Sequence, residues 1–451
     1  MKAATASESI AVDDLRVGMF VHLDMSWMAH PFPLGSFRIA SEEQVETIRS
    51  LGLQRLRWSP AQSELTVPGA GSIGGQHAAG PAVAPDDPPT PTLATEPGAK
   101  QAAEPEARAS HQRRLAAQHG ALQHCERQFA EAAHDCRLVN DLVTQQPAEA
   151  RAGAEKLSKA LVDKMLGEQD LCIRLLTSAA GDKASQHALN VTIVSLLMGR
   201  TFGLSEADML DLGVGAMLHD IGKIELPERV RHREDHFSAS EQRVYEEHVA
   251  HGVGHARRMG LSPGATLVIA QHHEHADGRG FPLRLNTDRL TAAARIVALV
   301  NRYDSLCNPH VAAHALTPHE SISLLFAQGR TKFDTAILGA FIRMMGVYPA
   351  GSTVQLTDDR FALVVGVNSS RPLKPRVLVH NAGMPREEAL ILDLEHAHSL
   401  GIRRSIRPVQ LPPASLEYLA PRPRVAYFFE PGVAAAAHAP AHAPAHARAT
   451  P

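Results

Sequence analysis

The chain has 451 residues, of which 44% are hydrophobic and 21% charged, and its formal net charge is -3. This length and composition predict two or three folded domains with apolar cores. The near-neutral charge excludes a global basic field for DNA or for an anionic membrane surface. No apolar stretch reaches the roughly 18 residues that a membrane-spanning helix needs. Four cysteines without a CxxC pair indicate reduced thiols, so we expect a cytoplasmic protein without membrane insertion.

The first part of the chain predicts a small α+β domain over residues 8–66. "LRVGMFVHLD" and "QRLRW" alternate like strands, and "SEEQVETIRSLGL" between them combines a helix cap with helical periodicity. Residues 67–108 are rich in Pro, Ala, Gly and Thr. We expect a disordered linker there, because such a segment buries too little apolar surface to order itself.

The chain then predicts helices up to residue 345. Residues 109–180 are rich in Ala, Leu, Gln and Glu with few breakers, which favours helices such as a two-helix hairpin. The helical pattern continues over residues 181–345, as in "ADMLDLGVGAMLHDIGK". Residues 346–429 alternate apolar and polar side chains and predict a small β-rich module. Residues 430–451 form a low-complexity tail, which we expect to be disordered.

Histidine and aspartate side chains gather in the region 181–345. The candidates are His187, His219, Asp220, His248, His272, His273 and Asp304. Neutral imidazoles and carboxylates suit iron, manganese or zinc. A carboxylate can bridge two ions, and paired ions can activate a water molecule while they hold phosphate oxygens. One helical histidine or one "HD" pair is common by chance, but the whole set in one helical region is a much stronger indication of a metal site.

Taken in order, "HDIGK", "HHEHADGRGFP" and "RYDSL" resemble the HD-GYP branch of the HD phosphohydrolases. Members of that branch hydrolyse cyclic di-GMP to the linear dinucleotide pGpG or to GMP at a centre of two or three metal ions. The opening segment also resembles an uncharacterised domain often found ahead of HD-GYP domains. The expected fold is mainly α, with an HD-type helical catalytic domain flanked by a small α+β N-terminal unit and a small β-rich C-terminal unit.

The resemblance also implies which side chains hold the metal ions. One ion would be held by His187, His219, Asp220 and Asp304. The other would be held by Asp220, His248, His272 and His273, so that Asp220 bridges the two. His251 is a nearby alternative to His248, which has the family's spacing from Gly252.

Further residues would act on the substrate. Lys223, together with Asp220, would be catalytic and would stabilise charge in the transition state; the alternative is a solvated lysine at a helix end. The loop that names the family would contribute to substrate binding, although its glycines and proline also favour a tight turn. Its residues are Gly278, Gly280, Phe281 and Pro282.

Three features depart from the family pattern. Phe281 replaces a tyrosine and removes a hydroxyl group. Lys183 stands where three-metal members place a Glu ligand, which favours two ions, iron or manganese or alternatively zinc. After Asp304, where active relatives carry basic residues that contact substrate phosphates, the chain has no Arg or Lys before Arg330, and Asn301 replaces an expected Asp. Because Arg side chains are the usual contacts to such phosphates, we expect substrate binding to be altered.

The resemblance to HD-GYP proteins, together with the set of metal ligands, implies a metal-dependent phosphodiesterase that hydrolyses cyclic di-GMP in bacterial second-messenger signalling. Two alternatives stay open. One is a catalytically weak HD-GYP module that acts by binding a nucleotide or a protein, and the other is a phosphohydrolase for another nucleotide. The altered segment after Asp304 favours the first alternative, whereas the complete ligand set opposes it. GGDEF-domain proteins or other signalling proteins are the expected partners.

Overall fold

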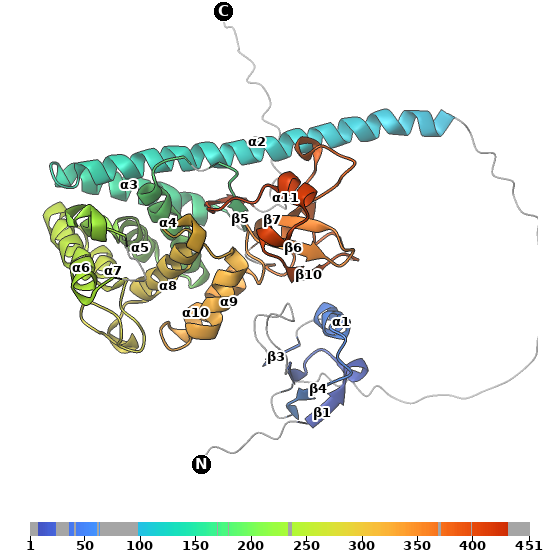
Figure 1. The fold of residues 1–451 in the computed structure, drawn as a ribbon, viewed down its shortest axis with the longest axis horizontal. Helices are drawn as coiled ribbons and strands as arrows, with labels where there is room; N and C mark the ends of the chain where they lie inside the picture. The colour runs from blue at the N-terminus through green and yellow to red at the C-terminus, as the bar shows by residue number, and fades with distance from the viewer. Residues whose placement is uncertain are drawn as a thin grey trace, which may run out of the picture. The chain divides into compact units, whose positions relative to one another are not determined.

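The computed structural model describes residues 8–23, 36–39, 42–60, 63, 98–168, 170–178, 180–232, 237–368, 371–397 and 399–431. The chain divides into two compact units, residues 1–114 and 115–451 (Figure 1). The linker expected at 67–108 lies outside the described residues up to residue 97, as does the expected tail from residue 432. No helix of the described part is long and apolar enough to cross a membrane.

Described residues 8–63 of the first unit form a four-stranded antiparallel sheet with the helix α1. The strand order is β1-β4-β2-β3, and the strands are β1 (Glu8–Ala11), β2 (Phe20–His22), β3 (Ser36–Arg38) and β4 (Arg55–Trp58). Helix α1 (Glu42–Ser50) turns Val45 and Ile48 toward the sheet, where they are fully buried with Val21. The α+β character expected for this region is confirmed. The strands β1 and β3 were not predicted.

Two long helices form a hairpin before the metal-ligand region. Helix α2 covers Gly98–Leu142, and α3 covers Pro147–Leu166 with proline in its first turn. The hairpin agrees with the helical expectation for residues 109–166. Residues 98–108, expected in the linker, are helical instead, because "GAKQAAEPEAR" is rich in the good helix formers Ala, Glu, Gln and Lys.

The candidate ligands lie in a bundle of seven helices that begin at capping side chains. The helices are α4 (Lys183–Thr201), α5 (Glu206–Leu218), α6 (Ala239–Met259), α7 (Pro263–Gln271), α8 (Ala292–Cys307), α9 (Pro318–Gln328) and α10 (Thr335–Met345). An Asp, Ser or Thr side chain accepts a hydrogen bond from the first turn of each. Helix α4 packs between α5 and α8 and buries every residue from Ala188 to Gly199. The apolar run in α4 is therefore a core helix.

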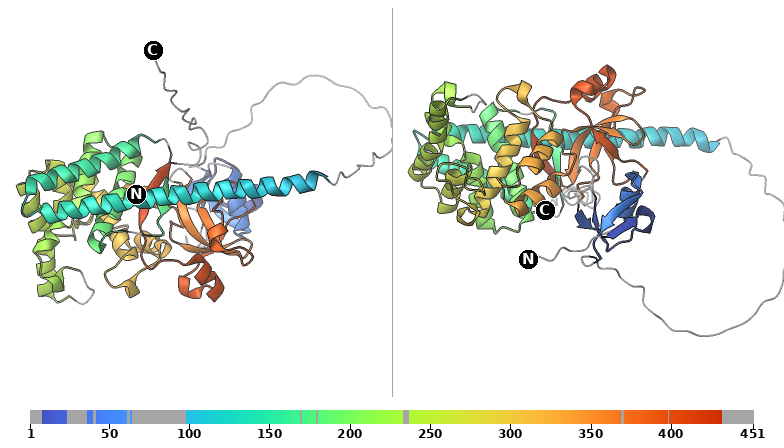
Figure 2. Two further views of the ribbon diagram at one scale, coloured as in Figure 1. Left: turned by 90° about the horizontal axis from the view of Figure 1, so that it is seen from above. Right: turned by 60° about the horizontal axis from the view of Figure 1, so that its bottom comes forward.

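A seven-stranded antiparallel sheet completes the second unit. Its strand order is β10-β6-β7-β5-β11, with β8 joining β7 and β9. The strands are β5 (Leu171–Leu175), β6 (Thr353–Leu356), β7 (Phe361–Asn368), β8 (Arg376–Val379), β9 (Leu392–Asp393), β10 (Ile402–Ser405) and β11 (Tyr427–Pro431), and α11 covers Pro413–Leu419. Figure 2 shows this sheet beside the helical bundle.

The sheet corrects two boundaries expected from the sequence. Strand β5 comes from the segment 109–180, which was expected to be helical throughout, and it lies between β7 and β11. Strand β11 continues to Pro431, beyond the expected end of the β-rich module at residue 429. The module is therefore not purely C-terminal. The mainly α class, with small sheets toward both ends of the chain, is confirmed.

Candidate metal centre

The ends of several helices bring the predicted ligands together. His219 is the residue after α5, and Asp220 opens the 3-10 turn η4 (Ile221–Glu225) that follows. His272 is the residue after α7, and His273 is next along the chain. His248 lies inside α6, and His187 lies in the second turn of α4. Ligands from four helices therefore converge on the single carboxylate of Asp220.

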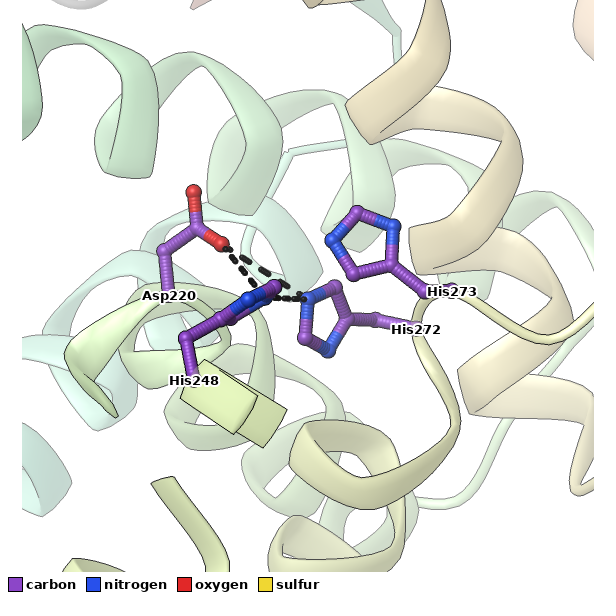
Figure 3. A group of neighbouring side chains, drawn as sticks. All are labelled: Asp220, His248, His272 and His273. Atoms are coloured by element: carbon purple, nitrogen blue, oxygen red, sulfur yellow. Dashed lines mark hydrogen bonds and ion pairs between the residues drawn. The ribbon is translucent and has the colours of Figure 1, made fainter. Parts of the chain in front are cut away.

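The Asp220 carboxylate faces histidines on two sides, and Figure 3 shows it opposite His248 and His272 of one set. Its Oδ1 is 3.5 Å from Nε2 of His248 and 3.6 Å from Nε2 of His272. Its Oδ2 is 3.4 Å from Nε2 of His219 and 3.7 Å from Nε2 of His187. His273 joins the group around Oδ1, within 4.8 Å of the other ligand atoms. Each oxygen thus faces its own set of imidazoles, as a bridging carboxylate would.

Hydrogen bonds to the main chain set the tautomers of three histidines. Nδ1 of His219 donates to the carbonyl of Ala216 at 2.7 Å, and Nδ1 of His272 donates to that of Ile269 at 2.8 Å. Nδ1 of His248 donates to the carbonyl three residues earlier at 2.5 Å. Because a carbonyl only accepts, the hydrogen of each neutral ring is on Nδ1. The lone pair of each Nε2 then points toward Asp220, which is the arrangement of metal-binding histidines.

The electrostatics favour a neutral ring at three of the histidines. Burial lowers the pKa of His219, lowers the pKa of His248 to about 3, and lowers the pKa of His273 well below its ordinary value, with help from the neighbouring histidines in the last case. These rings are therefore unprotonated at neutral pH and available as ligands.

The cluster fits divalent ions because acceptors face acceptors in it. Nε2 of His248 lies 3.4 Å from Nε2 of His272, and neither nitrogen carries a hydrogen in the tautomers described above. Nε2 of His219, Nε2 of His273 and Oδ1 of Asp220 are buried without a hydrogen-bond partner in the described part of the chain. Buried unpaired acceptors are costly unless a cation binds between them. Two nitrogen ligands of a tetrahedral ion lie about 3.4 Å apart, which matches the observed separation.

Asp304 lies behind His187. Its Oδ2 accepts a hydrogen bond from Nδ1 of His187 at 2.6 Å, and its Oδ1 accepts from Nδ2 of Asn190 at 2.9 Å and of Asn308 at 2.8 Å. Burial works against a charge on His187, but the hydrogen bond and charge of Asp304 outweigh it and raise the pKa of the ring. Asp304 is outside both groups of converging ligand atoms. Here it orients His187, and its role as a direct ligand stays a prediction.

Lys223 pairs with Asp220 inside the cluster. Its Nζ lies 2.6 Å from Oδ2 of Asp220 and 5.4 Å from the centroid of the Tyr245 ring. Burial opposes both charges, but the attraction between them prevails: it raises the pKa of Lys223 and, with His219, holds the pKa of Asp220 well below its usual value. The Lys223 side chain is only 21% exposed, so its surroundings differ from those of a solvated lysine at a helix end.

The loop from Gly278 to Pro282 packs against His273, one of the candidate metal ligands. The Phe281 ring stacks on His273 with their centroids 4.4 Å apart, and a Cβ at Gly280 would come within 2.4 Å of the His273 carbonyl oxygen. The buried carboxylate of Glu274 accepts hydrogen bonds from the main-chain N–H groups of Leu283 and Leu285. A substrate-binding role for the loop stays a prediction.

Sequence reasoning missed several residues of this site, although some carried a signal. Glu274 directly follows the two histidines, and Asn190 lies three residues after His187, on the same face of α4. Of the two alternatives on α6, His248 lies in the cluster, whereas His251 is exposed on the surface of the helix. Asn308 had no recognisable signal.

Two family profiles match the chain. A family profile described as "HD domain" matches residues 170–337, and one described as "Domain of unknown function (DUF3391)" matches residues 7–154. The second match extends beyond the expected domain at 8–66 into α3.

Relatives are found among bacterial phosphodiesterases. The chain is 26% identical to the cyclic di-GMP phosphodiesterase PA4108 of Pseudomonas aeruginosa, over 82% of this chain and 84% of the relative. It is 30% identical to the cyclic di-GMP phosphodiesterase response regulator RpfG of Xanthomonas campestris, over 33% of this chain and 40% of the relative. It is also 29% identical to the 3'3'-cGAMP-specific phosphodiesterase 2 of Vibrio cholerae, over 28% of this chain and 25% of the relative. The chain thus contains a region that matches the HD domain, preceded by a region that matches DUF3391, and it is similar to bacterial cyclic dinucleotide phosphodiesterases.

Proposed function

We propose that this chain is a metal-dependent phosphodiesterase that hydrolyses cyclic di-GMP. The observation that carries the proposal is the Asp220 carboxylate, whose two oxygens each face a separate set of imidazole Nε2 atoms. Two divalent ions held in this way supply Lewis-acid activation of a water molecule and bind phosphate oxygens. The relatives PA4108 and RpfG are both named cyclic di-GMP phosphodiesterases, which supports this substrate.

The side chains of the cluster would divide between two ions. His187 and His219 would hold one ion and the three histidines 248, 272 and 273 the other, with Asp220 shared. Asp304 would complete the first set as predicted from the sequence. Imidazole and carboxylate donors suit iron and manganese, and zinc is the alternative.

Lys223 would act on the substrate. Its raised pKa keeps the ammonium group charged at neutral pH, and the ion pair with Asp220 fixes its position at the centre. From there Nζ can donate to an oxygen of the scissile phosphate and offset the negative charge that develops there. Burial of the cluster strengthens this contact, because charges interact more strongly when water is excluded.

The names of two relatives favour 3'3'-cGAMP as a second candidate substrate. Two relatives from Vibrio cholerae are named 3'3'-cGAMP-specific phosphodiesterases, and this dinucleotide differs from cyclic di-GMP only in one base. The phosphodiester chemistry would be the same for both. Discrimination would depend on the residues that contact the bases.

The remaining assignments of the chain are part of the proposal. The helical region 181–345 would be the catalytic domain. The N-terminal domain has no assigned role. A cytoplasmic location and GGDEF-domain or other signalling proteins as partners stay predictions from the sequence.

A competition assay tests the substrate. Protein loaded anaerobically with iron or manganese would be incubated with cyclic di-GMP and, separately, with 3'3'-cGAMP, and the linear dinucleotides and mononucleotides that form would be separated by chromatography. We expect a higher kcat/KM for cyclic di-GMP, and a chelator-treated sample serves as the control. A higher kcat/KM for 3'3'-cGAMP would reassign the substrate, and binding of cyclic di-GMP without turnover would indicate a catalytically weak binding module.

A further inference from the structure

A small hollow lies beside the metal centre and carries two basic side chains. Its lining residues are Lys183, Gln186, His187, Asn190, Asn308, Arg424 and Val425. His187 belongs both to this hollow and to the cluster, because its Nε2 faces Asp220. The lining includes no acidic residue, and its positive charge comes from Lys183 and Arg424. The Asp304 carboxylate lies behind the lining, where it bonds His187 and two asparagines.

Arg424 comes from the segment before β11, more than a hundred residues beyond Asp304, and its position is fixed by its neighbour. The main-chain N–H of Val425 donates to Oδ1 of Asn308 at 2.8 Å. The carbonyl of Val425 accepts from Nδ2 of Asn308 at 2.9 Å and of Asn190 at 3.0 Å. The same two amide groups bond Asp304, which orients His187. The segment that carries Arg424 is therefore tied to the support of the metal centre.

Both cations have donors available for a ligand. Nη2 of Arg424 donates to the carbonyls of Pro309 at 2.8 Å and of His310 at 3.2 Å. Nε and Nη1 of Arg424 have no hydrogen-bond partner among the residues that the structure describes. The ammonium group of Lys183, an exposed residue of α4, also has none among these residues. The guanidinium group is thus held at Nη2, while Nε and Nη1 keep N–H donors that can each bond a phosphate oxygen.

We propose that Arg424, with Lys183 beside it, binds the second phosphate of the cyclic dinucleotide while the metal centre holds the scissile one. This inference rests on the proposed function. A cyclic dinucleotide carries two phosphates, and the segment between Asp304 and Arg330 contains no Arg or Lys for either. The hollow measures about 20 Å³, enough for about one water-sized group. It therefore accepts a phosphate oxygen rather than a base.

The main test compares Arg424→Ala with wild type on two substrates. We expect the KM for cyclic di-GMP to rise about ten- to a hundred-fold, the usual effect of one lost charge-assisted hydrogen bond. The kcat should stay similar, because the contact is made equally in the ground and transition states. Bis(p-nitrophenyl) phosphate has only the scissile phosphate, so its KM should not change. Arg422→Ala, which removes an exposed arginine of the same segment outside the lining of the hollow, is the matched control.

A second variant separates phosphate binding from support of the loop. Arg424→Gln keeps a donor for the Pro309 and His310 carbonyls but removes the charge, so it should bind cyclic di-GMP as weakly as Arg424→Ala. A wild-type KM in Arg424→Gln would show that Arg424 only holds the loop, and the inference would be wrong.

Calorimetric titration with cyclic di-GMP separates this inference from the proposed function. If wild type binds the dinucleotide and Arg424→Ala binds it ten- to a hundred-fold more weakly, the inference holds even if turnover is absent and the proposed function fails. Equal binding by the two proteins overturns the inference and leaves the proposed function intact. Absence of binding to wild type overturns both.

Discussion

At the scale of single residues, the site depends on which ring nitrogen of each histidine carries the hydrogen. The last carbonyls of a helix have no partner within that helix. His219 and His272 each follow a helix directly, and each donates Nδ1 to a carbonyl of its last turn. One hydrogen bond therefore completes the helix end and directs Nε2 toward Asp220. This explains physically why the ligands lie immediately after apolar helices in the sequence.

The position of Lys223 gives a residue-scale prediction. In Lys223→Met the hydrophobic stem is retained and the charge is lost. We expect the metal content to stay near that of wild type, since lysine is not a ligand, and kcat to fall by about 10²–10³-fold, the typical effect of losing one preorganised charge donor. Elemental analysis and steady-state kinetics on the same samples check both parts. An unchanged kcat would leave Lys223 only a partner of Asp220, without a catalytic role.

At the scale of elements, the short loop after α7 positions His273. A Cβ at Gly280 would lie 2.4 Å from the His273 carbonyl oxygen and 2.4 Å from the His275 main-chain nitrogen. Gly280→Ala therefore forces the loop to move, at a cost of about 1–3 kcal/mol of folding free energy, and shifts the Phe281 ring that stacks on His273. We expect a lower thermal midpoint together with loss of metal.

The control for that variant is another helical-region glycine. Gly254 lies in α6, and a Cβ there would meet nothing within 4 Å. Gly254→Ala should therefore keep its metal and be neutral or slightly stabilised, because alanine favours the helix. Equal metal loss in both variants would show that the loop geometry is not the cause.

Much of the element pattern could be predicted from the sequence, because it depends on local signals. The capping residues of the helices and the HD and HH pairs lie within a few residues of the elements they belong to. Strand β5 could not be predicted, because its pairing is with distant residues such as Val367 and Phe429. Arg424 was missed for the same reason, since only the folded chain brings it beside His187. The sequence has no Arg or Lys in the segment after Asp304, and the fold brings Arg424 beside His187 from another segment.

At the scale of the second unit, the sheet joins strands that come before and after the helical bundle in the chain. Glu430 of β11 lies buried between Arg174 of β5 and Arg376 of β8, and it forms ion pairs with both. Tyr427 of the same strand donates its main-chain N–H to Asn190 of α4. Strand β11 thus connects the sheet to the helix that carries His187.

This connection gives a prediction for the stability of the unit. Glu430→Gln leaves the buried guanidinium group of Arg174 and the partly buried one of Arg376 without their carboxylate. Breaking a buried pair in this way costs about 3–5 kcal/mol. We expect a clear fall in the thermal unfolding midpoint, measured by circular dichroism. Asp163→Asn, which removes an exposed ion pair with Lys159 on α3, is the matched control and should leave the midpoint unchanged. Equal shifts in the two variants would contradict the structural role assigned to Glu430.

The central claim is that Asp220 bridges two ions at the site of hydrolysis. The most direct test is elemental analysis of iron- or manganese-loaded protein, with cyclic di-GMP turnover assayed on the same samples, for wild type and Asp220→Asn. We predict about two ions per chain and turnover in wild type. In the variant we predict loss of most of the metal and of turnover, because both sets of histidines share that carboxylate. A normal metal content in Asp220→Asn, or turnover that persists in it, would contradict the account.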